Sequence, residues 1–346
     1  MAKDSMRGVL IGCGYASWFQ LEAWKQISDV EIVAVSSRNI ENARRRAAEF
    51  DIPKVYTDYR EMLDTEEFNF VDISTPPVVH LEMIKEAAKR GLHVLCQKPI
   101  ADTLQELSKM IDICSSAGVR FMVNENGRFQ PWFRKMKEII SIGKMGSPFH
   151  ANFSYHARMT LPKFNTGGQG NLFSKMPRLI TYELGVHSLD TLRYLFGEPL
   201  SLYALMNQVG EGIIGEDIAS LTVQLEGVQA LVDMSWASIP PRRYDQYASW
   251  GEYCIAAEKG TLLLEKNGLL HLVMDDCEET IQFPEEGELL GYLGAQQHFV
   301  DCMISCDAFE TSGTETLKTM ELVFGAYKSA EDNEVYWVGK DLDQLT

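Results

Sequence analysis

The side chains best suited to chemistry in this sequence are a lysine at the end of an apolar run and two acids around a histidine. Lys98 closes the strand-like part of the stretch VLCQKPI, and lysine is rarely buried without a partner or a function. Glu183, His187 and Asp190 are spaced i, i+4 and i+7, so a helix would present all three on one face. A histidine can take and return a proton near neutral pH, as general acid–base catalysis requires. Lys98, His187 and Glu183 are therefore the catalytic candidates, and we assign Asp190 to structure.

Each of these residues also has a purely structural interpretation. A lysine can extend its charge from an apolar stem to the solvent, and a lone histidine is more often a core residue than a catalyst. Glu183 could be a negative charge that the helix dipole favours near a helix N-terminus. The joint presence of Lys98 and His187 favours the catalytic interpretation.

The first 124 residues alternate short apolar runs with helical patterns, which predicts a parallel sheet of the doubly wound Rossmann type. The strand-like runs are nearly continuous in apolarity, as strands covered on both faces are, and they comprise residues 8–12, 31–36, 70–75, 93–97 and 120–124. Helical spacing, ending at or near glycine for two of the three, occupies residues 41–50, 78–91 and 104–118.

After residue 124 the pattern changes to strands joined by tight turns. The runs 218–225 and 228–236 flank Glu226-Gly227, and the runs 262–265 and 269–274 flank an Asn-Gly turn, which is a strong hairpin signal. Two helical stretches, 289–305 and 314–330, follow. We predict a Rossmann dinucleotide-binding domain over residues 1–124, and an α+β domain with a large, mostly antiparallel open sheet over residues 125–346.

A glycine-rich turn follows the first predicted strand. Gly12 permits the tight turn, Gly14 lets a pyrophosphate approach the backbone, and the next helix directs its N-terminus at the negative charge. Ser17 occupies the position where a third glycine is usual. The stretch Gly12, Gly14, Tyr15, Ala16 and Ser17 is the expected pyrophosphate site; the alternative is a glycine-rich turn without a ligand.

The end of the second predicted strand indicates which dinucleotide binds. An NAD site presents an acid there for the ribose 2′-hydroxyl, whereas this chain has Ser36, Ser37 and Arg38. A hydroxyl followed by a guanidinium suits a 2′-phosphate. We predict NADP, with NAD as an alternative in which Arg38 is only a solvated residue at a helix start.

Composition restricts the partners. The formal net charge of −17, from 32 basic and 49 acidic residues, argues against nucleic acid or an anionic membrane as the main partner. Neither a secretion signal nor a membrane span is indicated, so we expect a cytoplasmic location. The seven cysteines form no CxxC pair, and we expect no metal site.

Four motifs in order resemble the glucose-fructose oxidoreductase, inositol dehydrogenase and rhizopine-catabolism (Gfo/Idh/MocA) family of NAD(P)-dependent oxidoreductases. They are GCGYAS at residue 12, the long run from ISTPP at residue 73 to LQEL at 107, NENGRFQP at 124 and ELGVHSLDTLRYLFGEP at 183. The resemblance covers residues 7 to about 200. Beyond that, only the general architecture is similar, an open antiparallel sheet that in the family covers the active site and forms oligomer contacts. The resemblance therefore implies that the domain over residues 125–346 serves substrate binding and oligomerisation.

The resemblance implies roles for several residues. Lys98 matches the lysine of the family's Glu-Lys-Pro motif, which sits beside the nicotinamide and the substrate, although Gln97 replaces the glutamate. His187 matches the histidine that exchanges a proton with the substrate, and Glu183 stands where aspartate is usual. The positions expected to line the dinucleotide are Thr75, Pro76, His80, Gln97 and Lys98. The Lys98–Pro99 bond is a candidate cis peptide.

Three further segments carry weaker expectations. Asn126 and Arg128 lie in the segment that enters the second domain, and Asn126 is a substrate candidate. The segment 167–182 departs from the family pattern and is either a substrate lid or an exposed loop; Arg178 and Tyr182 are its substrate candidates. The aromatic and arginine-rich segment 235–250 is either an interface, which we favour, or a pocket wall.

The resemblance implies an oxidoreductase that moves a hydride to or from a hydroxyl or carbonyl carbon of a sugar, a polyol such as inositol, or a related cyclic diol. The partners expected are a small-molecule substrate and further copies of the chain, as a homodimer or homotetramer formed through the C-terminal sheet. Two alternatives from the same family are a dinucleotide-dependent glycoside hydrolase and a non-catalytic regulator that senses NADP.

Overall fold

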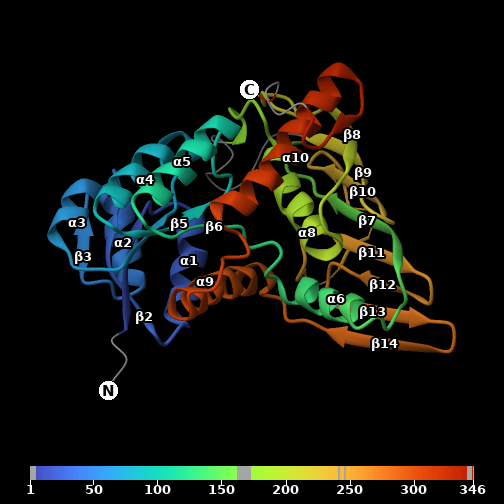
Figure 1. Cartoon of the computed structure of the whole chain (residues 1–346), viewed down its shortest axis with the longest axis horizontal. Coiled ribbons are helices and arrows are strands. Elements are labelled where there is room, and N and C mark those ends of the chain that lie inside the picture. The colour runs from blue at the N-terminus through green and yellow to red at the C-terminus, as the bar shows by residue number, and fades with distance from the viewer. Residues whose placement is uncertain (1–4, 162–172, 241, 245–246, 341–344, 346) are drawn as a thin grey trace. The chain divides into compact units, whose positions relative to one another are not determined.

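The computed structural model describes residues 5–161, 173–240, 242–244, 247–340 and 345, and these form two units (Figure 1). The first unit comprises the chain up to Asn126 together with Leu289–Lys318. The second comprises Gly127–Glu288 and Thr319–Leu345. The segment 289–318, which the sequence analysis kept with the C-terminal domain, thus belongs to the unit that contains the N-terminal strands.

The first unit contains the predicted Rossmann sheet. Six parallel strands follow the order β3-β2-β1-β4-β5-β6. Their bounds are β1 Met6–Ile11, β2 Val30–Ser36, β3 Lys54–Tyr56, β4 Phe70–Ile73, β5 His93–Gln97 and β6 Phe121–Asn124. Five of these strands match the predicted apolar runs. β3 was missed because it has only three residues, pairs with β2 alone at the edge of the sheet, and has no fully buried residue.

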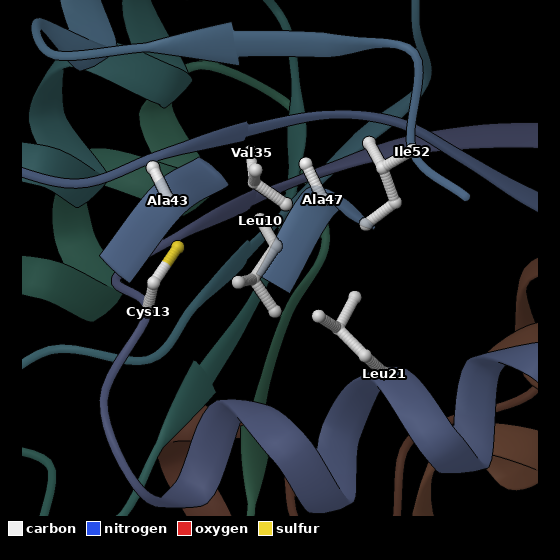
Figure 2. Packing of buried hydrophobic residues seen from close by; sticks show 7 residues of the cluster. All are labelled: Leu10, Cys13, Leu21, Val35, Ala43, Ala47 and Ile52. Atoms are coloured by element: carbon white, nitrogen blue, oxygen red, sulfur yellow. The ribbon is translucent and has the colours of Figure 1, made fainter. Parts of the chain in front are cut away.

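Helices connect the strands of this sheet. They are α1 Ala16–Lys25, α2 Ile40–Glu49, α3 Tyr59–Thr65, the 3₁₀ turn η1 Pro77–Val79, α4 His80–Lys89 and α5 Leu104–Ser116. Figure 2 shows how α1 and α2 pack on β1 and β2 through a buried cluster, whose members are Leu10, Cys13, Leu21, Val35, Ala43, Ala47 and Ile52. The small side chains Ala43 and Ala47 are the ones that α2 places in this cluster, which lets the helix lie close to the sheet.

A late helix completes the first unit. α9 spans Gly287–Ser305. Its Gln296 donates a hydrogen bond from Nε2 to the carbonyl oxygen of Gln20 at 3.1 Å, and its Phe299 packs against Phe70 and Trp24. The long-range pairing between α9 and α1 has no local sequence signal.

The second unit is built on a nine-stranded sheet of order β14-β13-β12-β11-β7-β10-β9-β8-β15. Every neighbouring pair is antiparallel except β7 and β10, which run parallel. The bounds are β7 Pro148–His156, β8 Ser201–Asn207, β9 Ile218–Gln224, β10 Gln229–Ser235, β11 Glu252–Ala257, β12 Gly260–Leu264, β13 Leu269–Met274, β14 Cys277–Gln282 and β15 Tyr336–Trp337. The predicted α/β fold class with a mostly antiparallel second sheet is confirmed.

Turn chemistry places the hairpins of this sheet as predicted. Gly227 joins β9 to β10 with φ of 73°, and Gly268 joins β12 to β13 with φ of 81°, conformations that favour glycine. The helices of the unit are α6 Pro131–Ser141, the π-helical turn η2 Thr181–Gly185, α8 Val186–Phe196 and, from Thr319 onward, α10 Gly313–Asp332. The predicted stop of the α8 helix is observed at Gly197, where φ is 95°. Within the described part of the chain, no helix has both the length and the apolar character that a membrane crossing requires.

One carboxyl group is buried in the first unit without a cation beside it. Asp72 of β4 is fully buried and accepts hydrogen bonds from Gln20 Nε2 at 2.6 Å and Trp24 Nε1 at 2.8 Å. Burial raises the pKa of Asp72 to about 7, although the bond from Trp24 opposes the shift. The folded state therefore binds a proton that the unfolded state releases near pH 4. The protonated Asp72 carboxyl therefore contributes its full stabilisation below about pH 4. This contribution is lost as pH rises through 7, where the folded state also releases the proton.

The substitution Asp72→Asn should remove this pH dependence. Asparagine accepts from Trp24 with its oxygen, and its amide can donate to Gln20 Oε1, which has no hydrogen-bond partner among the described residues. We expect the difference in unfolding free energy between D72N and the unmutated protein to shift in favour of D72N by about 3 kcal/mol between pH 5 and pH 8. Urea denaturation at both pH values measures this, with the exposed Asp29→Asn as the matched control. A difference that stays constant with pH would contradict the assignment.

Candidate active site

The turn after β1 is shaped for a phosphate group. Gly12 has φ of 102°, and a Cβ at this position would lie 2.2 Å from the carbonyl oxygen of Ser74. At Gly14, by contrast, no heavy atom of the described residues other than Gly14 and its two chain neighbours lies within 4 Å of the place that a Cβ would occupy. α1 begins directly afterwards, with no side-chain cap at Tyr15 and no acid in its first turn. Open space before uncapped helix amides fits a dinucleotide pyrophosphate.

The serine at the third glycine position has a role of its own. Ser17 is buried, donates to the carbonyl oxygen of Gly14 at 2.6 Å and accepts from Arg46 Nε at 3.2 Å. Arg46 also donates from Nη2 to the same carbonyl at 3.1 Å and pairs with Glu49 at 2.7 Å. The loop is therefore tied to α2. Sequence reasoning missed Arg46 because it lies in the run Arg44 to Arg46, which resembles a solvated helix face.

The segment after β2 presents a cation. The carbonyl oxygen of Ser36 accepts from Gly12 N at 2.8 Å, and the hydroxyl of Ser37 accepts from Asn39 N at 3.3 Å. Arg38 is exposed and makes no hydrogen bond or ion pair with another described residue. Its guanidinium is therefore available to an anionic ligand at the carboxyl end of β2.

His80 connects two loops at the same edge of the sheet. The imidazole is fully buried, with Nε2 2.7 Å from the carbonyl oxygen of Thr75 and Nδ1 2.9 Å from that of Ile100. Burial lowers the pKa of His80, and the two carbonyl contacts oppose that shift. Both ring nitrogens are thus engaged by the backbone, so His80 holds the Thr75-Pro76 loop and the Lys98–Ile100 segment together.

Lys98 follows β5 directly and is partly buried. The Lys98–Pro99 peptide bond is cis, as the sequence allowed. Gln97 accepts from Lys98 N at 2.7 Å and donates to the hydroxyl of Tyr292 at 3.0 Å. Where the family motif has a glutamate, the amide thus forms a neutral link to α9. The neighbouring strand ends in Asn124, which is paired in register with Gln97.

Two buried amides lie at or beyond the end of β6. The side chains of Asn124 and Asn126 are almost fully buried, yet neither their oxygens nor their nitrogens have a hydrogen-bond partner among the described residues. Buried polar groups are normally hydrogen-bonded. Together with the open space at Gly14, these amides suit a polar ligand at the carboxyl edge of the parallel sheet, where ligands of this fold bind.

The second unit carries the other catalytic candidates. Glu183 lies in the π-helical turn η2, and His187 follows in the first turn of α8, so the helix expected here is regular only from Val186 onward. His187 is 5% exposed, and its ring centroid lies 4.7 Å from that of Trp250. π-Helical turns occur frequently at functional sites.

Asp190 occupies a different environment. Its two carboxylate oxygens accept from Arg128 Nε at 2.6 Å and Nη2 at 2.8 Å, and Thr319 donates to it at 3.0 Å. Arg193 donates to Thr319 at 2.8 Å. This buried, fully hydrogen-bonded network anchors α8, in line with the structural role that the sequence analysis gave Asp190.

The substrate candidates Arg178 and Tyr182 contact aromatic residues of α10. The guanidinium of Arg178 lies 4.9 Å from the ring centroid of Phe324 and 5.5 Å from that of Tyr327. Tyr182 is buried, with its ring 6.4 Å from that of Phe324. The first part of the proposed lid, residues 167–172, lies outside the described residues, and the substrate role of Arg178 and Tyr182 stays a prediction.

Glu216 fixes the segment that leads to Glu183, and sequence reasoning missed it. Its buried carboxylate accepts from the backbone N–H of Leu179 at 3.1 Å and of Thr181 at 3.0 Å, and from the hydroxyl of Tyr327 at 2.6 Å. These bonds satisfy amides at the start of the π-helical turn. An acid just before a predicted strand carries no local signal for such a role. Among the described residues, no group of three metal-ligating side chains is close enough to hold a metal ion.

Comparison with known proteins adds context to these sites. The pattern described as "Oxidoreductase family, NAD-binding Rossmann fold" matches residues 6–125, and that described as "GFO/IDH/MocA C-terminal domain" matches residues 133–263. D-apiose dehydrogenase from Paraburkholderia graminis is 33% identical over 94% of this chain and 88% of its own. The scyllo-inositol 2-dehydrogenase (NADP(+)) of Bacillus subtilis is 26% identical over 75% of this chain and 76% of its own.

Among solved structures, an oxidoreductase from Agrobacterium radiobacter in complex with NAD+, L-tartaric acid and magnesium is similar over nearly the whole fold. The TM-score is 0.88 at 27% identity, covering 97% of this chain and 99% of the other.

Proposed function

Because the chain belongs to the Gfo/Idh/MocA family of oxidoreductases with an NAD-binding Rossmann fold, we propose that it transfers a hydride between NADP(H) and a hydroxyl or carbonyl carbon of a sugar, polyol or related cyclic diol. The main support for this proposal is the position of Lys98 in the fold. It follows β5 at the carboxyl edge of the parallel sheet, to which the loops of Gly12 and Thr75 also belong. The relatives named for D-apiose and scyllo-inositol support the substrate class.

The bound dinucleotide would supply the hydride chemistry, and the protein would supply orientation and proton transfer. The pyrophosphate would be held by the amides that follow Gly14. The ammonium of Lys98 would polarise the substrate oxygen by direct electrostatic contact. His187 would take the hydroxyl proton during oxidation and return it during reduction, and Glu183 would position the substrate or the histidine.

Arg38 supports NADP over NAD as the dinucleotide. An exposed guanidinium beside Ser37 at the end of β2 suits the two extra charges and the oxygens of a 2′-phosphate, because arginine makes bidentate bonds to phosphate. No acid stands at Ser36 or Ser37 to accept from a ribose 2′-hydroxyl. The name of the Bacillus subtilis relative includes NADP(+), whereas the Agrobacterium radiobacter structure contains NAD+.

Titration with NADPH and NADH, followed by nicotinamide fluorescence, tests the dinucleotide. We expect NADPH to bind about tenfold more tightly, roughly 1.4 kcal/mol, and Arg38→Ala to abolish the preference. Arg7→Ala is the control because Arg7 lies near the amino end of β1, away from the ligand edge of the sheet. Equal affinities in the unmutated protein would refute the NADP assignment and leave the roles of Lys98 and His187 intact.

Steady-state kinetics with a panel of sugars and polyols tests the catalytic roles. Lys98→Met and His187→Ala should each lower kcat/KM by a factor of about 100 or more, because each removes a positioned charge or proton carrier. Dinucleotide affinity should stay within about threefold of the unmutated protein. Lys85→Met, at an exposed position of α4, is the matched lysine control. If either site variant turns over its substrate as fast as the control, the role assigned to that residue is wrong.

We further propose that the chain forms a homodimer or homotetramer through the outer face of the nine-stranded sheet. Leu205, Leu231 and Val273 lie on the exposed side of their strands, with exposures of 58%, 36% and 43%. Exposed apolar side chains spread over three strands suit a protein partner. Light scattering should give at least twice the chain mass, and Leu231→Lys should lower it. A monomeric unmutated protein at micromolar concentration would exclude the assembly.

A further inference from the structure

The imidazole of His187 lies against the indole of a residue to which the sequence analysis gave no individual role. The ring centroids of His187 and Trp250 are 4.7 Å apart, and the ring planes are inclined by 43°. His187 is 5% exposed, whereas Trp250 is only partly buried. Part of the indole therefore remains accessible beside the proposed acid–base residue.

The backbone around Trp250 is held firmly in place. The N–H groups of Ala248 and Ser249 both donate to the carbonyl oxygen of Lys266, at 2.7 and 3.0 Å. The hydroxyl of Ser249 donates to the carbonyl oxygen of Gly251 at 3.0 Å. The same hydroxyl oxygen accepts from the backbone N of Gly251 at 3.3 Å. A side chain at Gly251 would put Cβ 2.6 Å from the carbonyl oxygen of Ser154. The chain is thus fixed on both sides of the tryptophan.

The lysine that receives these bonds is itself anchored. Lys266 is 6% exposed, and its ammonium donates to the carbonyl oxygen of His156 at 2.7 Å. Burial lowers the pKa of Lys266, while the charge of Glu252 opposes that shift. This arrangement joins the segment before β11 to the end of β7, so the position of the indole is set by the sheet.

We propose that Trp250 is a positioning residue for His187, and that the accessible part of its indole is the apolar wall of the substrate subsite. The second part rests on the proposed function. A sugar or polyol ring has a face of C–H groups, which packs on an aromatic ring while its hydroxyls remain free for polar partners. Contact with the indole also restricts the imidazole to the orientation in which it must exchange a proton. The contact favours the pocket-wall alternative for this part of the segment 235–250.

A spectroscopic experiment tests the positioning role without requiring activity. In protein carrying 13C-labelled histidine, the His187 signal is identified among the seven histidines by its loss in His187→Gln. Because the indole lies within 5 Å, its ring current displaces this signal. Trp250→Ala should move the His187 signal, Trp250→Phe should move it less, and Trp337→Ala, at an exposed tryptophan of β15, should leave it unchanged. A signal that does not move in Trp250→Ala overturns the positioning role.

Kinetics on the best sugar or polyol substrate test the wall. Trp250→Ala should lower kcat/KM at least tenfold with a raised KM and an unchanged NADPH affinity, and Trp250→Phe should restore kcat/KM to within about threefold of the unmutated protein. An unchanged KM in Trp250→Ala would refute the role of Trp250 as the apolar wall of the substrate subsite. If the unmutated protein turns over no sugar or polyol, both the proposed function and the wall role of Trp250 are wrong. The change in the His187 signal still tests the positioning role in that case. If Trp250→Ala does not fold, Trp250→Leu, which keeps an apolar side chain but removes the aromatic ring, replaces it in both measurements with the same expected changes.

Discussion

The close passage of two backbone segments at Gly12 is the constraint on which the nucleotide edge of the first unit depends. A Cβ there would lie 2.2 Å from the carbonyl oxygen of Ser74, and φ is 102°, so no other residue meets both conditions without strain. The amide of Gly12 donates to Ser36, and that of Ser74 donates to Ile11. These bonds hold the carboxyl ends of β1, β2 and β4 together. The open space at Gly14 and the direction of α1 follow from this junction.

Buried charged groups set the geometry of the second unit. Asp190 receives a bidentate guanidinium and a hydroxyl, and Glu216 receives two backbone amides and a phenol. Burying a charge is costly unless partners replace the lost water, and here they do. Asp72 in the first unit meets only neutral donors, and its raised pKa shows the difference. A buried carboxylate thus anchors the helix that bears His187 in the second unit, whereas the raised pKa of Asp72 leads us to expect stability that depends on pH in the first.

The predictable parts of the fold have local causes. Continuous apolar runs identified five strands of the parallel sheet, and glycines with positive φ marked the hairpins at Gly227 and Gly268 and the end of α8 at Gly197. The edge strand β3 and the π-helical turn before α8 were not predictable. β3 is three residues long, and a π-helical turn differs from an α-helix in hydrogen-bond pattern and not in composition.

By itself, the sequence determined the dinucleotide turn, the order of the strands along the chain, and the residue types suited to chemistry, because each depends on residues that are neighbours in the chain. Tertiary structure decided which charges are buried and what they contact. Arg46 belongs to an arginine run that resembles a solvated helix face, yet its guanidinium donates to the carbonyl oxygen of Gly14. Glu216 and Trp250 likewise contact residues more than thirty positions away in the sequence. Such contacts depend on how strands and helices far apart in sequence pack, which no local pattern encodes.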